Sequence, residues 1–455
     1  MDAKEMTAYR NKLFTDVYNN TVPDRVPVME AFSFGFHAEH AGENFLQVLY
    51  NLNDEVLDRI FESTMTFARG DQIGLGSQKN AYGLMFSKSK VMNIAANGMI
   101  QHPEVSMMHE DEYDEFIQDP YAFMVGKARN RSYGMCDTDD KAQYLINYLR
   151  LTQAEAEQSR VMAAAASRAA DKYGLFKAPP GSGGSLPVPF DVLADTNRGF
   201  SNIVKDIKRM PEKVLEACEA LEPYAMWVGN RSKPGPLSAN GIPGHMAPYL
   251  RNKEFEKFYW PSFEKLIHLQ AARGQKTNIF AEQNWERFLD YLQELPMGTR
   301  MYMEFGDPKK FKDKLGNKMA LGGFYPISLL KTGTKEQCVD KLKELLDIMM
   351  PGGNYFFRFD KSALRLGDLN IENYTAVMDY LFDHSKYDNA GEKVSDVKLK
   401  DTIKHFDPVP EFKSKYFIPF EEWIADYKVP DDSVLPRLKE TYDRISSAVY
   451  PLLTR

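Results

Sequence analysis

The second half of the chain alternates short apolar runs with amphipathic stretches of helical length, and this rhythm constrains the fold more than any other feature. The apolar runs are residues 236–245, 276–282, 299–304, 318–323 and 354–359. Stretches with helical periodicity follow at 254–273, 285–295, 334–350 and 371–382, and Asp307 and Pro308 open a further helix. Five consecutive strand–helix repeats with short connections predict a parallel sheet covered by helices.

The first half of the chain supplies three more candidate strands, at residues 26–30, 72–75 and 176–179. A total of about eight strands would close a (β/α)8 TIM barrel, an α/β fold that we predict for residues 1–388. This unit includes an N-terminal helical segment and one or two long helices over residues 140–173. Residues 389–455 are a charged, proline-punctuated C-terminal extension, which we expect to pack on the barrel or on a partner.

The composition is that of an enzyme-sized globular chain. The 455 residues include 57 Lys and Arg against 64 Asp and Glu, a net charge of −7. Phosphate contacts need clustered basic residues, and the basic runs here are interleaved with acidic residues, so we expect no nucleic-acid partner. The start of the chain is polar and no apolar run reaches the ~18 residues of a membrane helix. Three scattered cysteines favour a reducing cytoplasm.

Polar residues that end apolar strands are the informative positions, because the active site of such a barrel lies at the C-terminal ends of its strands. Five stand out: Glu30, His245, Glu282, Glu304 and Asp307. A histidine and several carboxylates at one barrel mouth could bind zinc through nitrogen and oxygen ligands, or act as acid and base. For Glu304 and Asp307, a loop hydrogen bond or a helix cap is the favoured interpretation. For His245 and Glu282 a role in the site is favoured, because both lie at predicted strand ends in successive units.

Aromatic residues cluster just beyond the predicted strand ends. Phe32, Phe34 and Phe36 follow the first strand in alternation, and Phe324 and Tyr325 follow the strand that ends at residue 323. Such rings usually belong to the core, but beyond strand ends they could also form an apolar pocket for an aromatic substrate.

Several segments resemble the uroporphyrinogen decarboxylase superfamily over residues 24–382. The matching stretches are residues 24–28 (Asp-Arg-Val-Pro-Val), 189–199, 210–217, 254–261, 281–282 with 287–292, 322–330 with 332–334, and 372–373. This resemblance implies a (β/α)8 barrel, in agreement with the strand–helix rhythm.

The resemblance also separates the two chemistries of that superfamily. True decarboxylases carry two arginines after the first strand that grip the carboxylates of the tetrapyrrole, and here Phe32 and Phe36 stand at those positions. Apolar rings cannot replace bidentate carboxylate clamps, so uroporphyrinogen is rejected as the substrate. The other branch comprises zinc-dependent methyltransferases that work with corrinoid proteins.

Members of that branch that methylate thiols carry a His-x-Cys motif where this chain has residues 280–282, so Glu282 replaces the first sulfur ligand. A zinc site with harder His and Glu ligands suits a Lewis acid that polarises a methyl ether oxygen. No cobalamin-binding Asp-x-His-x-x-Gly signature occurs, so the cobalamin is expected on a separate corrinoid protein that docks over the barrel mouth. The C-terminal extension could shape that docking face or a homodimer interface.

Our leading hypothesis is a methyltransferase component of a corrinoid-dependent demethylation system. His245 and Glu282 would hold zinc, with Glu30 or Asp307 completing the shell, and Phe32, Phe34, Phe36, Phe324 and Tyr325 would surround a small aromatic methyl ether. The alternative is a metal-independent decarboxylase or lyase of the same superfamily that uses Asp71 or Asp191 with Arg198. A third reading is a barrel that only binds a ligand or a protein.

Overall fold

The computed structural model of the chain describes residues 1–30, 32–75 and 81–454, and its central feature is a parallel sheet of five strands in the order β5-β6-β7-β8-β9. These strands are β5 (Gly183–Ser185), β6 (Ala239–Gly244), β7 (Thr277–Asn284), β8 (Arg300–Phe305) and β9 (Ala320–Gly323). A parallel pair, β1 (Met29–Glu30) and β2 (Gln72–Ile73), and an antiparallel pair, β3 (Asn93–Ile94) and β4 (Ile100–Gln101), accompany it. The predicted α/β class with a parallel sheet is confirmed.

Helices make up most of the remaining structure. The first half contains α1 (Ala3–Tyr18), α2 (Phe34–His40), α3 (Phe45–Leu49), α4 (Asp54–Thr64), α5 (Ala81–Ser87), α6 (Tyr113–Gln118), α7 (Pro120–Phe123), α8 (Arg129–Ser132), α9 (Lys141–Tyr173), α10 (Pro189–Asp191), α11 (Phe200–Arg209) and α12 (Pro211–Gly229). The second half contains α13 (Asn252–Glu254), α14 (Trp260–Ala272), α15 (Leu289–Leu292), α16 (Pro308–Leu315), α17 (Leu329–Thr332), α18 (Lys335–Met349), α19 (Ile371–His384), α20 (Leu399–Thr402), α21 (Phe420–Ile424) and α22 (Leu435–Val449). Within the described chain, every helix is too short or too polar to form a membrane span.

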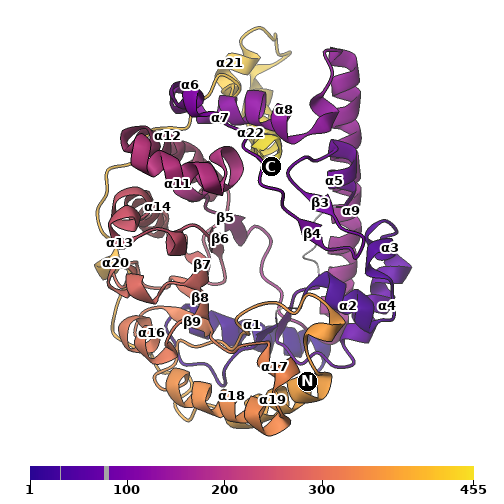
Figure 1. Cartoon of the computed structure of the whole chain (residues 1–455), viewed down its shortest axis with the longest axis vertical. Helices are drawn as coiled ribbons and strands as arrows, with labels where there is room; N and C mark the ends of the chain where they lie inside the picture. Colours follow the sequence, from indigo (N-terminus) through magenta and orange to yellow (C-terminus); the bar gives the residue numbers. More distant parts are fainter. Residues whose placement is uncertain (31, 76–80, 455) are drawn as a thin grey trace.

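The helices surround the sheet on its outer side. Figure 1 shows α12, α14 and α16 outside the strands, and α9 as a long helix on the opposite side of the molecule. Buried strand residues such as Ile279, Met301 and Leu321 belong to the main core together with residues of these helices. The alternate strand residues face the other side of the sheet, because successive side chains of a strand point to opposite faces.

Helix α1 covers one end of this inner face of the sheet. Its residues Phe14, Val17 and Tyr18 form a second buried cluster with Ala320 of β9 and with Phe356. The sheet therefore has a fully packed outer face and an inner face that α1 closes at one end.

The hydrogen bonds do not form the closed eight-stranded barrel that we predicted. Single bridges, Leu321 to Tyr355 and Val28 to Phe357, join the segment 355–359 to β9 and to the chain before β1. Between β2 and β5, no strand ladder occurs within residues 1–30, 32–75 and 81–454. The parallel sheet is thus observed, whereas barrel closure is not.

The strand predicted at residues 176–179 is the main reason for this difference. The segment is a loop that donates one backbone hydrogen bond toward β2, from Phe176 N to Asp71 O at 2.9 Å. The segment ends at Pro179 and Pro180 follows it, and neither can donate to a ladder because proline has no N–H group. The strand resumes only at β5.

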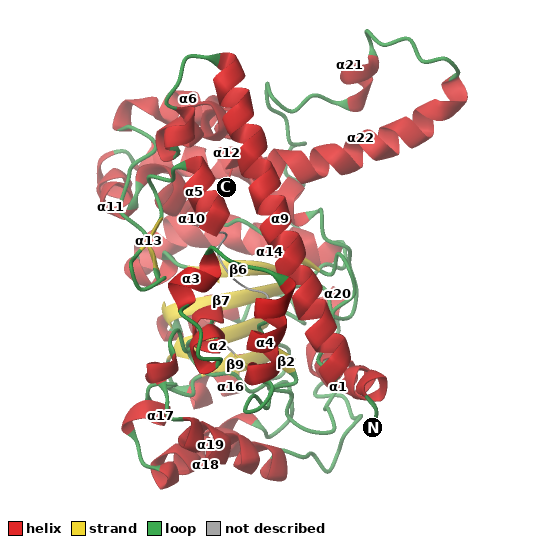
Figure 2. Cartoon of the chain, turned by 90° about the vertical axis from the view of Figure 1, so that its right-hand side faces the viewer, coloured by secondary structure: helices red, strands yellow, loops and turns green. Residues whose placement is uncertain are grey.

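The C-terminal segment first packs against the body and then leaves it. Phe412 contacts the rings of Tyr121 and Trp227, with centroid distances of 5.5 and 5.2 Å. Helix α22 buries none of its residues, and Figure 2 shows it projecting from the rest of the molecule together with α21. The domain boundary at residue 388 remains a prediction.

Candidate functional site

His245 directly follows β6 and lies beside Asp195. Its Nδ1 is 2.8 Å from Asp195 Oδ1, and 37% of the histidine side chain is exposed. Asp195 belongs to the π-helical segment Val192–Arg198, a conformation that is frequent at functional sites. The hydrogen bond to Asp195 raises the pKa of His245 to about 9, although burial opposes this shift. A carboxylate thus orients the ring through Nδ1 and leaves Nε2 for a ligand or substrate.

Gly244 brings the end of β6 into close contact with β7. A Cβ atom at this position would lie 2.5 Å from the Trp285 ring and 3.0 Å from the carbonyl oxygen of Phe280. Only glycine allows this approach of two backbones, so the position of His245 depends on the absence of a side chain one residue earlier.

A bulge at the end of β7 brings Glu282 and Glu304 together. The register of β7 against β8 shifts here, and Gln283 has a φ of 60°, which is uncommon for a residue other than glycine. The backbone N–H of Gln283 donates to Glu304 Oε2 at 2.9 Å. Burial raises the pKa of Glu282, the charge of His245 lowers it, and Glu304 raises it. The imidazole and the two carboxylates are therefore close enough to affect one another.

Lys361 brings a positive charge to the same place from beyond the segment 355–359. Its Nζ lies 3.5 Å from Glu304 Oε2, and 44% of its side chain is exposed. The preceding residue, Asp360, accepts hydrogen bonds from the backbone N–H groups of Ile327 and Lys361. The site thus combines an imidazole, carboxylates and a lysine at the ends of successive strands.

Asp191 supports the loop that carries His245. It is buried, and its two oxygens accept hydrogen bonds from Met246 N at 3.0 Å and from the Tyr259 hydroxyl at 2.9 Å. Burial raises the pKa of Asp191 to about 7. Its contacts make it a positioning residue for the His245 loop.

A cavity adjoins this group of residues. Its volume is about 540 Å³, and it is lined by Pro248, Tyr249, Gln283, Asn284, Glu286 and Arg287. The Tyr249 ring lies 5.9 Å from the His245 ring, and Gln283 directly follows Glu282. The polar group therefore borders a space that a small molecule could enter.

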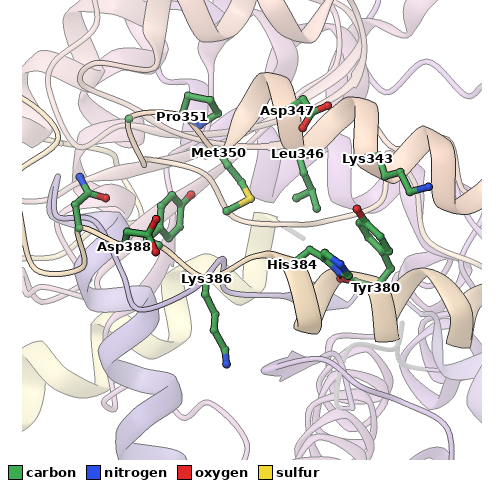
Figure 3. A pocket seen from close by; sticks show the side chains of 12 residues that line it. Lys343, Leu346, Asp347, Met350, Pro351, Tyr380, His384, Lys386 and Asp388 are labelled. Carbon is green, nitrogen blue, oxygen red and sulfur yellow. The ribbon is translucent and has the colours of Figure 1, made fainter.

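Another cavity, of about 450 Å³, lies between α18, α19 and the chain that follows α19 (Figure 3). The His384 ring stacks on Tyr380 at 3.9 Å. The lysines that line this cavity, Lys343 and Lys386, are matched by Asp347 and Asp388. The mixed charges select no class of ligand.

The donor atoms at the ends of β6 to β8 suit zinc in their chemistry. Zinc accepts imidazole nitrogen and carboxylate oxygen, and a carboxylate commonly orients the second nitrogen of a ligating histidine, as Asp195 does here. In the described part of the chain, however, no three His, Cys, Asp or Glu side chains are already gathered as a ligand shell. His245 and Glu282 fit such a metal, and a third ligand would have to move into place.

Glu30 lies apart from this group. Its Oε1 accepts a hydrogen bond from Arg69 N at 3.1 Å, and its side chain packs on Gly70. Burial raises the pKa of Glu30 to about 8. Because neighbouring Met29 packs on the buried cluster that α1 forms on the inner face, Glu30 faces the opposite side of the sheet. The structure does not bring it to His245.

Asp307 is the N-cap of α16, as the sequence indicated. Its carboxylate accepts a hydrogen bond from Lys309 N at 2.9 Å, and Pro308 occupies the first helical turn. Its own N–H donates to Glu286 Oε2. These contacts account for the residue without a catalytic role, and they do not join it to His245.

The phenylalanines after β1 are packed in the core. Phe32, Phe34 and Phe36 are 4%, 0% and 0% exposed. Phe32 stacks on Phe36 with a centroid distance of 4.8 Å, and both contact Phe67. Their predicted contact with a substrate stays a prediction. In the structure, these rings pack the segment after β1 against α2.

Phe324 and Tyr325 are also buried. The Phe324 ring contacts Phe311 of α16 at 5.3 Å, and the backbone of Phe324 has a φ of 67°. The Tyr325 hydroxyl donates to the carbonyl oxygen of Cys338 at 2.9 Å. Their predicted contact with a substrate likewise remains a prediction.

Sequence reasoning did not select two residues of the site, Asp195 and Lys361. Asp195 lies in an irregular helical turn that has no apolar strand before it, and Lys361 follows a segment that pairs only through bridges. Glu304 was considered but left out of the zinc shell. Its position at a strand end was the signal that could have placed it there.

Comparison with known proteins shows similarity of structure only. No protein-family model and no curated protein matches the sequence. Solved structures of similar fold include a methyltransferase from Methanosarcina mazei, which is 13% identical in sequence. The TM-score is 0.52, and the alignment covers 82% of this chain and 98% of that one. At this level of identity, the likeness shows a shared fold.

Proposed function

We propose that the protein is a methyltransferase that removes the methyl group of a small aromatic methyl ether and passes it to a corrinoid protein. The observation that carries this proposal is the oriented His245, paired with Asp195 and placed next to Glu282 and Glu304 at the ends of successive strands. The shared fold with a methyltransferase supports it.

In this proposal His245 and Glu282 hold zinc, and Glu304 completes the shell in place of Glu30 or Asp307. Bound there, zinc would act as a Lewis acid on the ether oxygen. Asp195 fixes the ring of His245 through Nδ1, and the bulge at Gln283 holds Glu304 by a backbone hydrogen bond. Lys361 balances part of the negative charge.

The corrinoid partner would approach over the ends of β6 to β8. Methyl transfer needs the acceptor in line with the carbon–oxygen bond, within a few ångströms. The cavity beside Tyr249 and Gln283 lies at that edge, so the ether is expected to enter there.

A decarboxylase or lyase of the same superfamily is the second candidate. The His245–Asp195 pair favours it, because such a pair can transfer a proton without a metal. Arg198 is the basic residue that the sequence suggested for a decarboxylase. Its guanidinium already binds Asp206 and the carbonyl oxygen of Met108.

The deciding experiment is elemental analysis of protein purified without chelator or affinity metal. We expect about one zinc per chain, lost in His245→Ala and Glu282→Ala. The matched control is Glu286→Ala, a nearby glutamate whose carboxylate pairs with Lys310, and it should keep the metal. Asp195→Asn should weaken zinc binding about 10- to 100-fold.

The activity assay uses methoxylated aromatics, a reduced corrinoid protein and the same variants. Methyl-corrinoid should form with the wild type and not with Glu282→Ala. Metal-free wild-type protein that releases carbon dioxide from an acid without a corrinoid would favour the lyase instead.

A further inference from the structure

The inner face of the sheet carries a layer of aromatic rings below the polar group. Phe280 of β7 and Tyr302 of β8 are register partners, and their rings stack with a centroid distance of 4.8 Å. Both side chains are only half-buried, in contrast to the core residues that alternate with them. Glu282 and Glu304 lie two residues further along the same strands. The aromatic layer and the carboxylates thus belong to one continuous surface.

Arg358 brings a guanidinium to this layer. Its Cζ lies 4.1 Å from the centroid of the Tyr302 ring, and its Nη1 contacts Met29 Sδ at 3.2 Å. A thioether is a weak acceptor, and the Nε of Arg358 is buried without any hydrogen-bond partner. Over the described residues, no carboxylate lies within ion-pair distance of this arginine.

Other arginines that pack inside the protein have oxygen acceptors for their guanidinium groups. Arg198 pairs with Asp206, and Arg25 pairs with Asp71. Arg300, one layer further from the site, also has an unpaired Nε, but its Nη atoms donate to the carbonyl oxygens of Pro236, Leu237 and Ser238. Arg358 is half-buried and lacks such oxygen acceptors, although removing a cation from water without an acceptor is costly. An external anion would satisfy it.

We infer that Arg358 anchors a carboxylate on the aromatic ring of the substrate, so that the enzyme acts on methoxylated aromatic acids. The inference rests on the proposed function and names its substrate class. The planar guanidinium matches a carboxylate in a bidentate manner. The substrate ring would lie among Phe280, Tyr302 and Met29.

The spacing agrees with this orientation. The glutamates lie two residues beyond the aromatic layer, which is about 6.6 Å along a strand. One benzene ring with its two para substituents has a similar length. A ring held at Arg358 by its carboxylate therefore presents its methoxy group to Glu282, Glu304 and His245.

The test measures binding and needs neither zinc nor a corrinoid. Titration calorimetry compares 4-hydroxybenzoate, a demethylated product analogue, with neutral 4-hydroxybenzamide. The wild type should bind the acid at least about tenfold more tightly, and Arg358→Met should abolish the preference. Arg358→Lys retains the positive charge but loses the planar guanidinium that can bind both carboxylate oxygens, so it should bind the acid with intermediate affinity. Circular dichroism checks that each variant is folded.

Lys361→Met is the matched control, because it removes the cation at Glu304 and leaves Arg358 in place. It should keep the preference for the acid. Equal affinity of the wild type for acid and amide, or a preference that survives in a folded Arg358→Met, would overturn the anchor.

These outcomes are distinguishable from failure of the proposed function. A preference that depends on Arg358 in a protein without demethylase activity would establish the anchor and reject the methyltransferase. Demethylation of neutral and acidic ethers at equal rates would support the methyltransferase and reject the anchor.

Discussion

At the scale of single residues, buried charges connect the structure to pH. The Lys276 Nζ donates to the carbonyl oxygen of Tyr18 and to Asn19 Oδ1, each at 2.6 Å. Burial lowers the pKa of Lys276 from 10.5 to about 7, and the charge of Arg300 adds to this effect. The folded protein therefore binds fewer protons than the unfolded chain between about pH 7 and 10.5.

In that window the unfolded chain carries a proton on Lys276 that must be released on folding. The free energy of unfolding should therefore rise with pH. The difference in unfolding free energy between wild type and Lys276→Met should grow by a few kcal/mol at most, on the order of 1 kcal/mol per pKa unit. Urea denaturation at several pH values measures it. Lys253→Met, at an exposed position, is the control and should show no trend. A flat difference for Lys276→Met would contradict the prediction.

At the scale of secondary structure elements, the close approach of β6 to β7 positions the site. The Cβ of Gly244→Ala would meet the Trp285 ring and the backbone of Phe280. Overpacking of this kind typically costs about 1–3 kcal/mol, and the shift should also displace His245. We expect lower thermal stability and at least about tenfold weaker zinc binding.

Gly241→Ala is the matched control in the same strand, since its Cβ would meet only the carbonyl oxygen of Gly184, at an ordinary 3.6 Å. Zinc binding should persist in this variant. If both substitutions had the same effect, the close approach at Gly244 would not be what places His245.

At the scale of the whole molecule, α1 joins the start of the chain to the inner face of the sheet. Phe14 is 0% exposed, and its ring contacts Phe176 at 4.8 Å and Tyr18 at 5.6 Å. Phe14→Ala should reduce the free energy of unfolding by about 3–5 kcal/mol. Lys12→Ala, on the exposed side of the same helix, should change it by less than about 0.5 kcal/mol. Guanidinium denaturation measures both, and a loss below 1 kcal/mol for Phe14→Ala would show that α1 is dispensable.

The sequence alone determined the local elements of the second half. Apolar runs of strand length and amphipathic helices are written into short stretches, so β6 to β9, α18 and α19 lie close to their predicted positions. The capping role of Asp307 is equally local, because it depends only on the next few residues.

Only the tertiary structure decided which residues meet. Glu30 and Glu282 both end predicted strands, yet Glu30 faces away from His245, because a shift of one residue along a strand changes the face. Asp195 reaches His245 across 50 residues of sequence. Arg358 is conspicuous only because its neighbours on the inner face supply no anion. Contacts of this kind depend on register and on the packing of distant segments, which no local pattern of residues encodes.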